Sequence, residues 1–168
     1  MGGGFSNLSN QYAATISGGY DNTASQSYST VGGGYRNTAS GQFATIAGGG
    51  ESTPGNAATR NRVTDEYGTI GGGGFNLAGN ATGSPTDAFY ATVSGGLQNS
   101  ARHQYATVGG GRLNTATQIY ATVGGGLQNT ASNQYATVGG GRVNTASQAY
   151  ATIGGGFLNQ ATSIYSTV

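Results

Sequence analysis

The chain has 168 residues, of which only 7% are charged, 34 are glycine and none is cysteine, and its formal net charge is +1. This composition excludes the clustered basic surface that nucleic-acid recognition needs, a disulfide framework and thiolate chemistry. It also contains no run long and apolar enough to insert into a membrane.

A short repeating unit accounts for the whole chain. Its clearest copy is YATVGGG at residues 105–111, followed by NTA at residues 114–116. Ten such units begin at residues 2, 17, 32, 47, 71, 94, 109, 124, 139 and 154; eight are 15 residues long, whereas residues 47–70 and 71–93 form units of 24 and 23 residues. Because the glycines keep a constant phase, the sequence predicts one repeat domain over residues 1–168 rather than a flexible linker.

Each unit contains two short β-forming stretches. The first, YATV, alternates along the chain and ends at glycines, which permit a backbone reversal. The second begins at an asparagine that suits either a left-handed corner or a stacked amide ladder; these asparagines are Asn22, Asn37, Asn99, Asn114, Asn129, Asn144 and Asn159. The sequence therefore predicts an all-β fold, a parallel β-solenoid of ten coils.

In chain order, three regular units are followed by two with insertions, within residues 47–70 and 71–93, and then by five regular units. Because the two longer coils are neighbours, we expect their loops to lie side by side on one edge of the rod. This candidate ligand lobe contains Glu51, Arg60, Arg62, Asp65, Glu66 and Asp87.

Alternation assigns the faces of the first strand. Ala106 and Val108 are expected in the core, joined by Ala116 from the second strand, while Tyr105 and Thr107 face outward. The outward aromatic row comprises Tyr28, Phe43, Tyr67, Tyr90, Tyr105, Tyr120, Tyr135, Tyr150 and Tyr165. An unbroken exposed aromatic stripe marks an interaction surface, so Tyr90, Tyr105, Tyr120, Tyr135, Tyr150 and Tyr165 are candidate oligomer contacts.

No catalytic, cofactor or metal site is predicted. The glycine turns lack the Gly-Lys-Ser/Thr of a phosphate loop, and aspartate does not recur regularly as in calcium-binding repeats. His103 reads as a surface residue, and no base stands beside a nucleophile. Asp65, Glu66 and Asp87 could form a carboxylate pair or metal site, but solvated loop charges paired with Arg60 and Arg62 are the more common arrangement.

A threonine row runs through all ten units, from Thr15 to Thr167. Regularly spaced methyl and hydroxyl groups on a flat face can order water, which raises ice binding as an alternative function. The expected neighbour of this row on the same face is the tyrosine row, which would disturb its flatness.

The sequence resembles the head repeats of YadA-like trimeric autotransporter adhesins, and similar repeats occur in phage fibres. The matching pieces are Ala44-Thr45-Ile46 with its glycines and Asn37-Thr38-Ala39-Ser40-Gly41. The resemblance implies a left-handed β-roll, a homotrimer, an extracellular location at the cell surface, and attachment to host matrix, glycan or other cells.

The sequence therefore favours a non-catalytic structural or adhesive surface rod, with a ligand-binding module acting through the insertion lobe as the alternative. Val168 is in phase with Gly2 of a following copy. We accordingly expect either a fragment of a longer head or subunits that stack head-to-tail into a filament.

Overall fold

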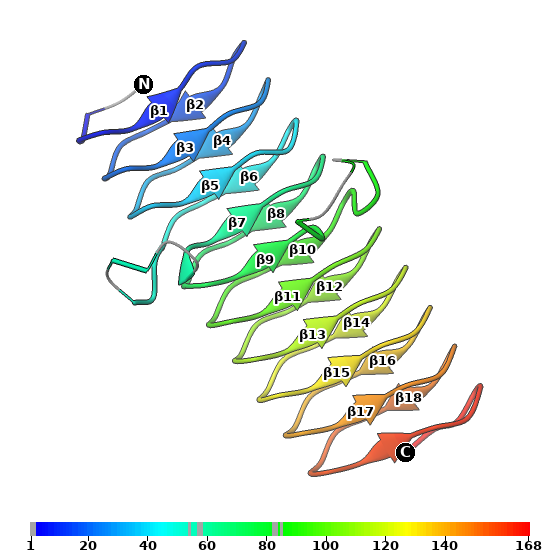
Figure 1. The fold of residues 1–168 in the computed structure, drawn as a ribbon. Helices are drawn as coiled ribbons and strands as arrows, with labels where there is room; N and C mark the ends of the chain where they lie inside the picture. The colour runs from blue at the N-terminus through cyan, green and yellow to red at the C-terminus, as the bar shows by residue number, and fades with distance from the viewer. Residues whose placement is uncertain (1–2, 54, 57–58, 82–83, 85) are drawn as a thin grey trace.

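In the computed structural model, the chain forms a straight stack of flattened coils (Figure 1). The structure describes all residues except 1–2, 54, 57–58, 82–83 and 85. Every strand pairs in parallel with its equivalent in the next coil, so the expected all-β parallel solenoid of ten coils is confirmed.

The first sheet has ten strands in the described part of the chain, one from the asparagine side of each coil. They are β1 (Leu8–Ser9), β3 (Thr23–Ala24), β5 (Thr38–Ala39), β7 (Arg62–Val63), β9 (Leu77–Ala78), β11 (Ser100–Ala101), β13 (Thr115–Ala116), β15 (Thr130–Ala131), β17 (Thr145–Ala146) and β19 (Gln160–Ala161).

The second sheet has nine strands among the described residues, and each ends at the last residue of a repeat unit. They are β2 (Thr15–Ile16), β4 (Thr30–Val31), β6 (Thr45–Ile46), β8 (Thr69–Ile70), β10 (Thr92–Val93), β12 (Thr107–Val108), β14 (Thr122–Val123), β16 (Thr137–Val138) and β18 (Thr152–Ile153). The sheets pair like with like, for example Thr107 with Thr122 and Val108 with Val123.

The tyrosines lie in a turn, which corrects their expected place in the strand. The N–H of Ala106 donates to the carbonyl of His103 at 3.0 Å and closes a tight turn. Tyr105 occupies the third position of that turn with φ of 58°. A coil of 15 residues must reverse direction twice, so only the last two residues of YATV remain extended. We call this turn the aromatic corner.

The expected core is confirmed. Val108 of the second sheet, Ala116 of the first sheet and Ala106 beside the aromatic corner are all fully buried. Their equivalents repeat along the rod as one continuous cluster. Small residues fill the space between the sheets because a two-sided coil this flat has little interior volume.

The asparagines form a buried amide ladder, which decides between the two roles left open by the sequence. The Oδ1 atom of Asn114 accepts the backbone N–H of Asn129 at 2.9 Å. Its Nδ2 atom donates to the carbonyls of Gly110 and Gly126, each at 2.8 Å. The left-handed residue is the one that precedes the asparagine, such as Leu113.

Glycine is required at the second turn, which we call the glycine corner. Gly111 has φ of 81°, and a Cβ atom there would clash with the carbonyl oxygen of Gly126 in the next coil. The close approach of successive coils thus explains why this position is glycine in the regular units.

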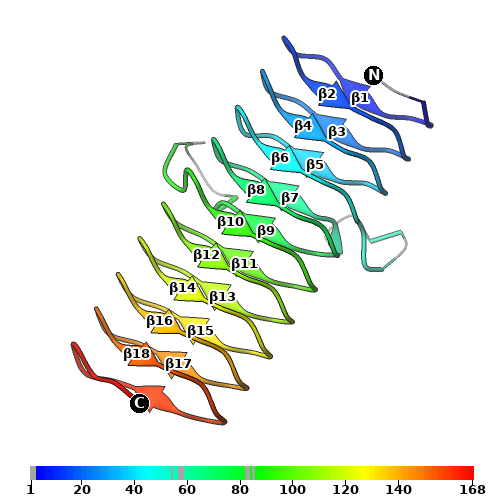
Figure 2. The same ribbon diagram turned by 180° about the vertical axis from the view of Figure 1, so that it is seen from behind.

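The two insertions leave the rod at opposite corners, so the expectation that they lie side by side is wrong (Figures 1 and 2). The first follows Glu51 at the glycine corner, where Ser52 and Thr59 hydrogen bond at 3.0 Å. The second follows Gly79 at the aromatic corner. Both fall between the glycines and the next aromatic residue, but the first-sheet strand follows the first insertion and precedes the second.

We predict that Asn114→Ala lowers the free energy of unfolding by about 2–5 kcal/mol, because the buried N–H of Asn129 and the carbonyl of Gly110 lose their partner. The carbonyl of Gly126 loses one of its two donors and keeps the N–H of Arg112. Denaturant titration followed by circular dichroism would measure the change. Gln134→Ala, at an exposed position of a neighbouring coil, is the control. A loss no larger than that of the control would contradict a stabilising role for the ladder.

Candidate functional site

The six charged residues of the expected lobe do not come together. Glu51 and Arg60 flank the first insertion at the glycine corner, whereas Asp65 and Asp87 lie at the aromatic corner beside the second. Arg62 belongs to strand β7, on the outer side of the first sheet. A single charged lobe is therefore absent from the described chain, because the two loops emerge from opposite turns.

An ion-pair column links three coils at the glycine corner. The Nε atom of Arg36 lies 2.9 Å from the Asp21 carboxylate and its Nη1 atom 3.3 Å from that of Glu51. The guanidinium also lies over the ring of Tyr35, 5.3 Å from its centroid. Opposite charges alternate along the column, so Arg36 separates the two carboxylates and the column stabilises the stacking of these coils.

Asp65 holds the second insertion against the rod. Its buried carboxylate accepts from the hydroxyl of Thr64 at 2.7 Å, the N–H of Asn80 at 3.0 Å and the N–H of Ala88 at 3.3 Å. Burial raises the pKa of Asp65, and a hydrogen bond with Asp87 raises it further. The side-chain amide of Asn80 lowers the pKa of Asp87. Asp65 is therefore buried rather than a solvated loop charge. The carboxylate pair that the sequence left as the less common alternative exists between Asp65 and Asp87, as a structural clasp without Glu66.

The aromatic row forms a continuous stack. Neighbouring rings from Tyr28 to Tyr165 have centroids 4.7–5.4 Å apart and planes within 3–17° of parallel. Because each ring covers the faces of its neighbours, ring edges and hydroxyls are what remains exposed. The residues from Tyr28 to Tyr150 keep 37–45% of their surface in solvent.

A second, shorter aromatic stack was missed in the sequence. Phe5, Tyr20 and Tyr35 stack at the glycine corner with centroids 5.3–5.4 Å apart. The signal was present, since each follows the glycines of its unit. It fades after Tyr35, where Gly50 and Gly74 take the equivalent positions.

The threonine row lies on the outer side of the second sheet, in register from coil to coil. Beyond each strand the chain continues into small residues, such as Gly109 after Val108. The hydroxyl of Thr107 makes only a 3.5 Å contact with the carbonyl of Tyr105, so it remains available to water. With the tyrosines at the corner, this face is less obstructed than the sequence suggested.

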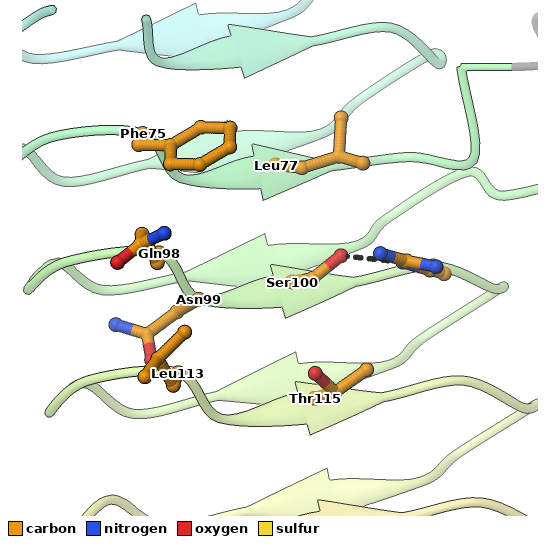
Figure 3. A pocket seen from close by; sticks show the side chains of 8 residues that line it. Phe75, Leu77, Gln98, Asn99, Ser100, Leu113 and Thr115 are labelled. Carbon is orange, nitrogen blue, oxygen red and sulfur yellow. Dashed lines mark hydrogen bonds between the residues drawn. The ribbon is translucent and has the colours of Figure 1, made fainter. Parts of the chain in front are cut away.

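A depression of about 260 Å³ interrupts the outer face of the first sheet. Figure 3 shows Phe75 and Leu77 on one coil, Gln98 and Ser100 on the next, and Leu113 with Thr115 on the third. Arg102 closes one side and donates from Nε to the Ser100 hydroxyl at 2.8 Å. The sequence reading missed this site, although the repeat itself marks it. Five other coils have threonine where Leu77 and Ser100 stand: Thr23, Thr38, Thr115, Thr130 and Thr145.

No family model and no curated protein matches this sequence. The described part of the chain contains no helix with the length and hydropathy needed to cross a bilayer. Within the same residues, no group of three or more histidine, cysteine, aspartate or glutamate side chains is placed to hold a metal ion.

We predict that Asp65 makes stability decrease with increasing pH. Its pKa in the folded chain is raised above the ordinary 3.8, so its contribution is fully present below that value and is lost as pH rises through the folded pKa. The pKa of Asp87 is instead lowered from 3.8, so its contribution to stability is lost as pH falls below that value. Asp65→Asn should therefore flatten the decline above pH 3.8, as measured by thermal unfolding across pH.

Glu66→Gln is the matched control, because Glu66 adjoins Asp65 in the same coil but is not part of the clasp. It should leave the slope of the wild-type profile unchanged. Identical slopes in the wild type and Asp65→Asn would show that Asp65 titrates alike in the folded and unfolded chains, contrary to this prediction.

Proposed function

We propose that this chain is a non-catalytic structural rod of a cell-surface adhesive assembly, as its resemblance to YadA-like heads implies. Its partners would be further copies of itself, with a homotrimer as the expected assembly, and host matrix, glycan or other cells. The observation that carries the proposal is the unbroken aromatic row, because it presents one continuous ridge for lateral association.

The geometry of the ridge supports self-association. Nine rings from nine successive coils keep their edges in solvent with centroids 4.7–5.4 Å apart, and an identical ridge on another copy has the same spacing. Aromatic edges meet favourably in offset or edge-to-face pairs, and tyrosine adds a hydroxyl that can hydrogen bond across an interface. A symmetric assembly would repeat each contact along the rod.

A ligand-binding module centred on one insertion lobe is less well supported. Its charged residues are divided between opposite corners, and two of them, Glu51 and Asp65, have buried side chains that bind within the chain. Glu51 pairs with Arg36, which also pairs with Asp21, and Asp65 binds the second loop. Adhesive contacts are therefore better sought on the rod faces.

We expect simultaneous Tyr105→Asn, Tyr120→Asn, Tyr135→Asn and Tyr150→Asn substitutions to dissociate the oligomer. Asparagine tolerates the left-handed backbone of these corners, so the change removes rings without adding backbone strain. Size-exclusion chromatography with light scattering should report a lower mass, while circular dichroism tests whether the coils persist.

The control replaces Thr107, Thr122, Thr137 and Thr152 by serine. These residues lie two positions further along the same four coils, on the second sheet, and should leave the oligomer intact. A well-folded, monodisperse monomer of the unmutated chain would overturn the proposal.

Ice binding by the threonine row is the second candidate, favoured by the placement of the tyrosines at the corner instead of on the strand. Thr107→Lys, Thr122→Lys and Thr137→Lys should abolish thermal hysteresis of the purified chain, because long charged side chains disrupt an ordered water layer. The same change at Thr115, Thr130 and Thr145, on the opposite face of the same solenoid, should not. Absence of thermal hysteresis in the wild type would exclude this function.

A further inference from the structure

We propose that the depression on the first sheet binds one acidic sugar unit of a glycan, with Arg102 recognising its carboxylate. The inference rests on the proposed adhesive role and adds to it a site and a ligand class. It depends on a local departure from the repeat, because each residue of the site can be compared with the residue at the same position in the other coils.

The depression exists because several repeat positions change together. The outward residue of the first-sheet strand is threonine at Thr23 and Thr38 before the site and at Thr115, Thr130 and Thr145 from its lower edge onward. Between them stand Arg62, Leu77 and Ser100. Ser100 lacks the threonine methyl group, so the middle coil is recessed between the coils of Leu77 and Thr115.

The position two residues beyond the strand's first residue changes as well. Ser25, Ser40, Thr117, Ser132 and Ser147 occupy it in regular coils, whereas Arg102 occupies it here. The hydroxyls of Ser132 and Ser147 donate to the backbone carbonyls of Ala146 and Ala161, at 3.4 and 3.3 Å. Arg102 instead donates a hydrogen bond from Nε to the hydroxyl of Ser100, at the floor of the depression.

Arg102 is placed to bind an anion. It is exposed, and its side chain makes no other hydrogen bond with the described residues. None of the residues lining the depression is acidic. The bond to Ser100 orients the guanidinium, which can then present its terminal N–H groups to a carboxylate in the bidentate geometry that arginine favours.

The other lining residues suit a sugar ring. Phe75, Leu77 and Leu113 form an apolar surface against which the C–H groups of a pyranose can pack. Gln98, Ser100 and Thr115 supply an amide and two hydroxyls for the ring hydroxyl groups. This combination of an apolar wall with a few polar groups is typical of small-molecule sites.

Size limits the ligand to one buried unit. The volume of about 260 Å³ falls just below the roughly 300–1,000 Å³ of sites for drug-sized ligands. A longer glycan would therefore extend from the depression along the face. Arg62, paired in register with Leu77 on the adjacent strand, would then meet a second carboxylate.

The test uses tetragalacturonate and its fully methyl-esterified form, in which a neutral methyl ester replaces each carboxylate. Isothermal titration calorimetry with the full chain should give saturable binding of the acid and none of the ester. Arg102→Gln should weaken binding by about tenfold to a hundredfold, since hydrogen bonds to charged groups are the stronger kind. Arg142→Gln, at an exposed arginine three coils further on, should have no effect.

A second variant restores the repeat through Leu77→Thr, Ser100→Thr and Arg102→Ser. Each new residue is of the type found at that position in regular coils, so the variant should fold at least as well as the wild type and lose binding. This guards against loss of binding through unfolding.

The proposal is overturned if the wild type does not bind tetragalacturonate saturably, if it binds the ester equally well, or if Arg102→Gln binds unchanged. Stronger binding of hexaglutamate than of the saccharide, dependent on Arg102, would also overturn it, in favour of an acidic peptide. Light scattering of the tyrosine variants tests self-association separately, so failure of the rod proposal and of the glycan site can be told apart.

Discussion

The structure depends on one constraint: each residue stacks on its own equivalent, one inter-strand spacing of about 4.8 Å away. A side chain can repeat only if it interacts well with a copy of itself. An asparagine amide both donates and accepts, and aromatic rings stack face to face, so both form rows. Like charges at this spacing repel by about 1 kcal/mol in water and by more near the protein. This explains a charged fraction of only 7% and the alternation of Asp21, Arg36 and Glu51 where charges do stack.

The same constraint explains the strained corners. Left-handed backbone costs a non-glycine residue about 1–2 kcal/mol, and it occurs at both turns of the regular coils, as at Leu113 and Tyr105. An aromatic pair contributes about 0.5–1.5 kcal/mol beyond the area it buries, so ring stacking offsets most of the strain at the aromatic corner. Each inner ring of the row stacks on two neighbours, which favours a straight, stiff rod.

Much of the fold could be predicted because period and alternation depend on local chemistry. The repeat defined ten coils, and Ala106, Val108 and Ala116 were correctly placed in the core. Turn geometry was harder, since Tyr105 has strand propensity but lies where the chain must reverse. The insertions were assigned to one edge because the position of each was judged relative to the aromatic residue of its unit, which follows both of them. That comparison does not show whether an insertion precedes or follows the first-sheet strand. Asn61 was missed in the ladder because the first insertion precedes it and shifts its phase. Asn7 and Asn76 were missed although both keep the regular offset from the start of their units.

Candidate sites followed a different logic from the fold. The sequence drew attention to six charged residues, and the structure engages Glu51 in the ion-pair column and Asp65 with Asp87 in the clasp. A strict repeat offers the same surface at every coil. It therefore suits self-association or binding of a repetitive polymer, but it cannot distinguish one level of the rod from another. Recognition at a defined level needs a departure from the repeat. Leu77, Ser100 and Arg102 make such a departure without disturbing the strands beneath them, because their backbone keeps the register of the coils on either side. The solenoid can therefore vary its surface at one level while the amide ladder and the core hold the rod unchanged.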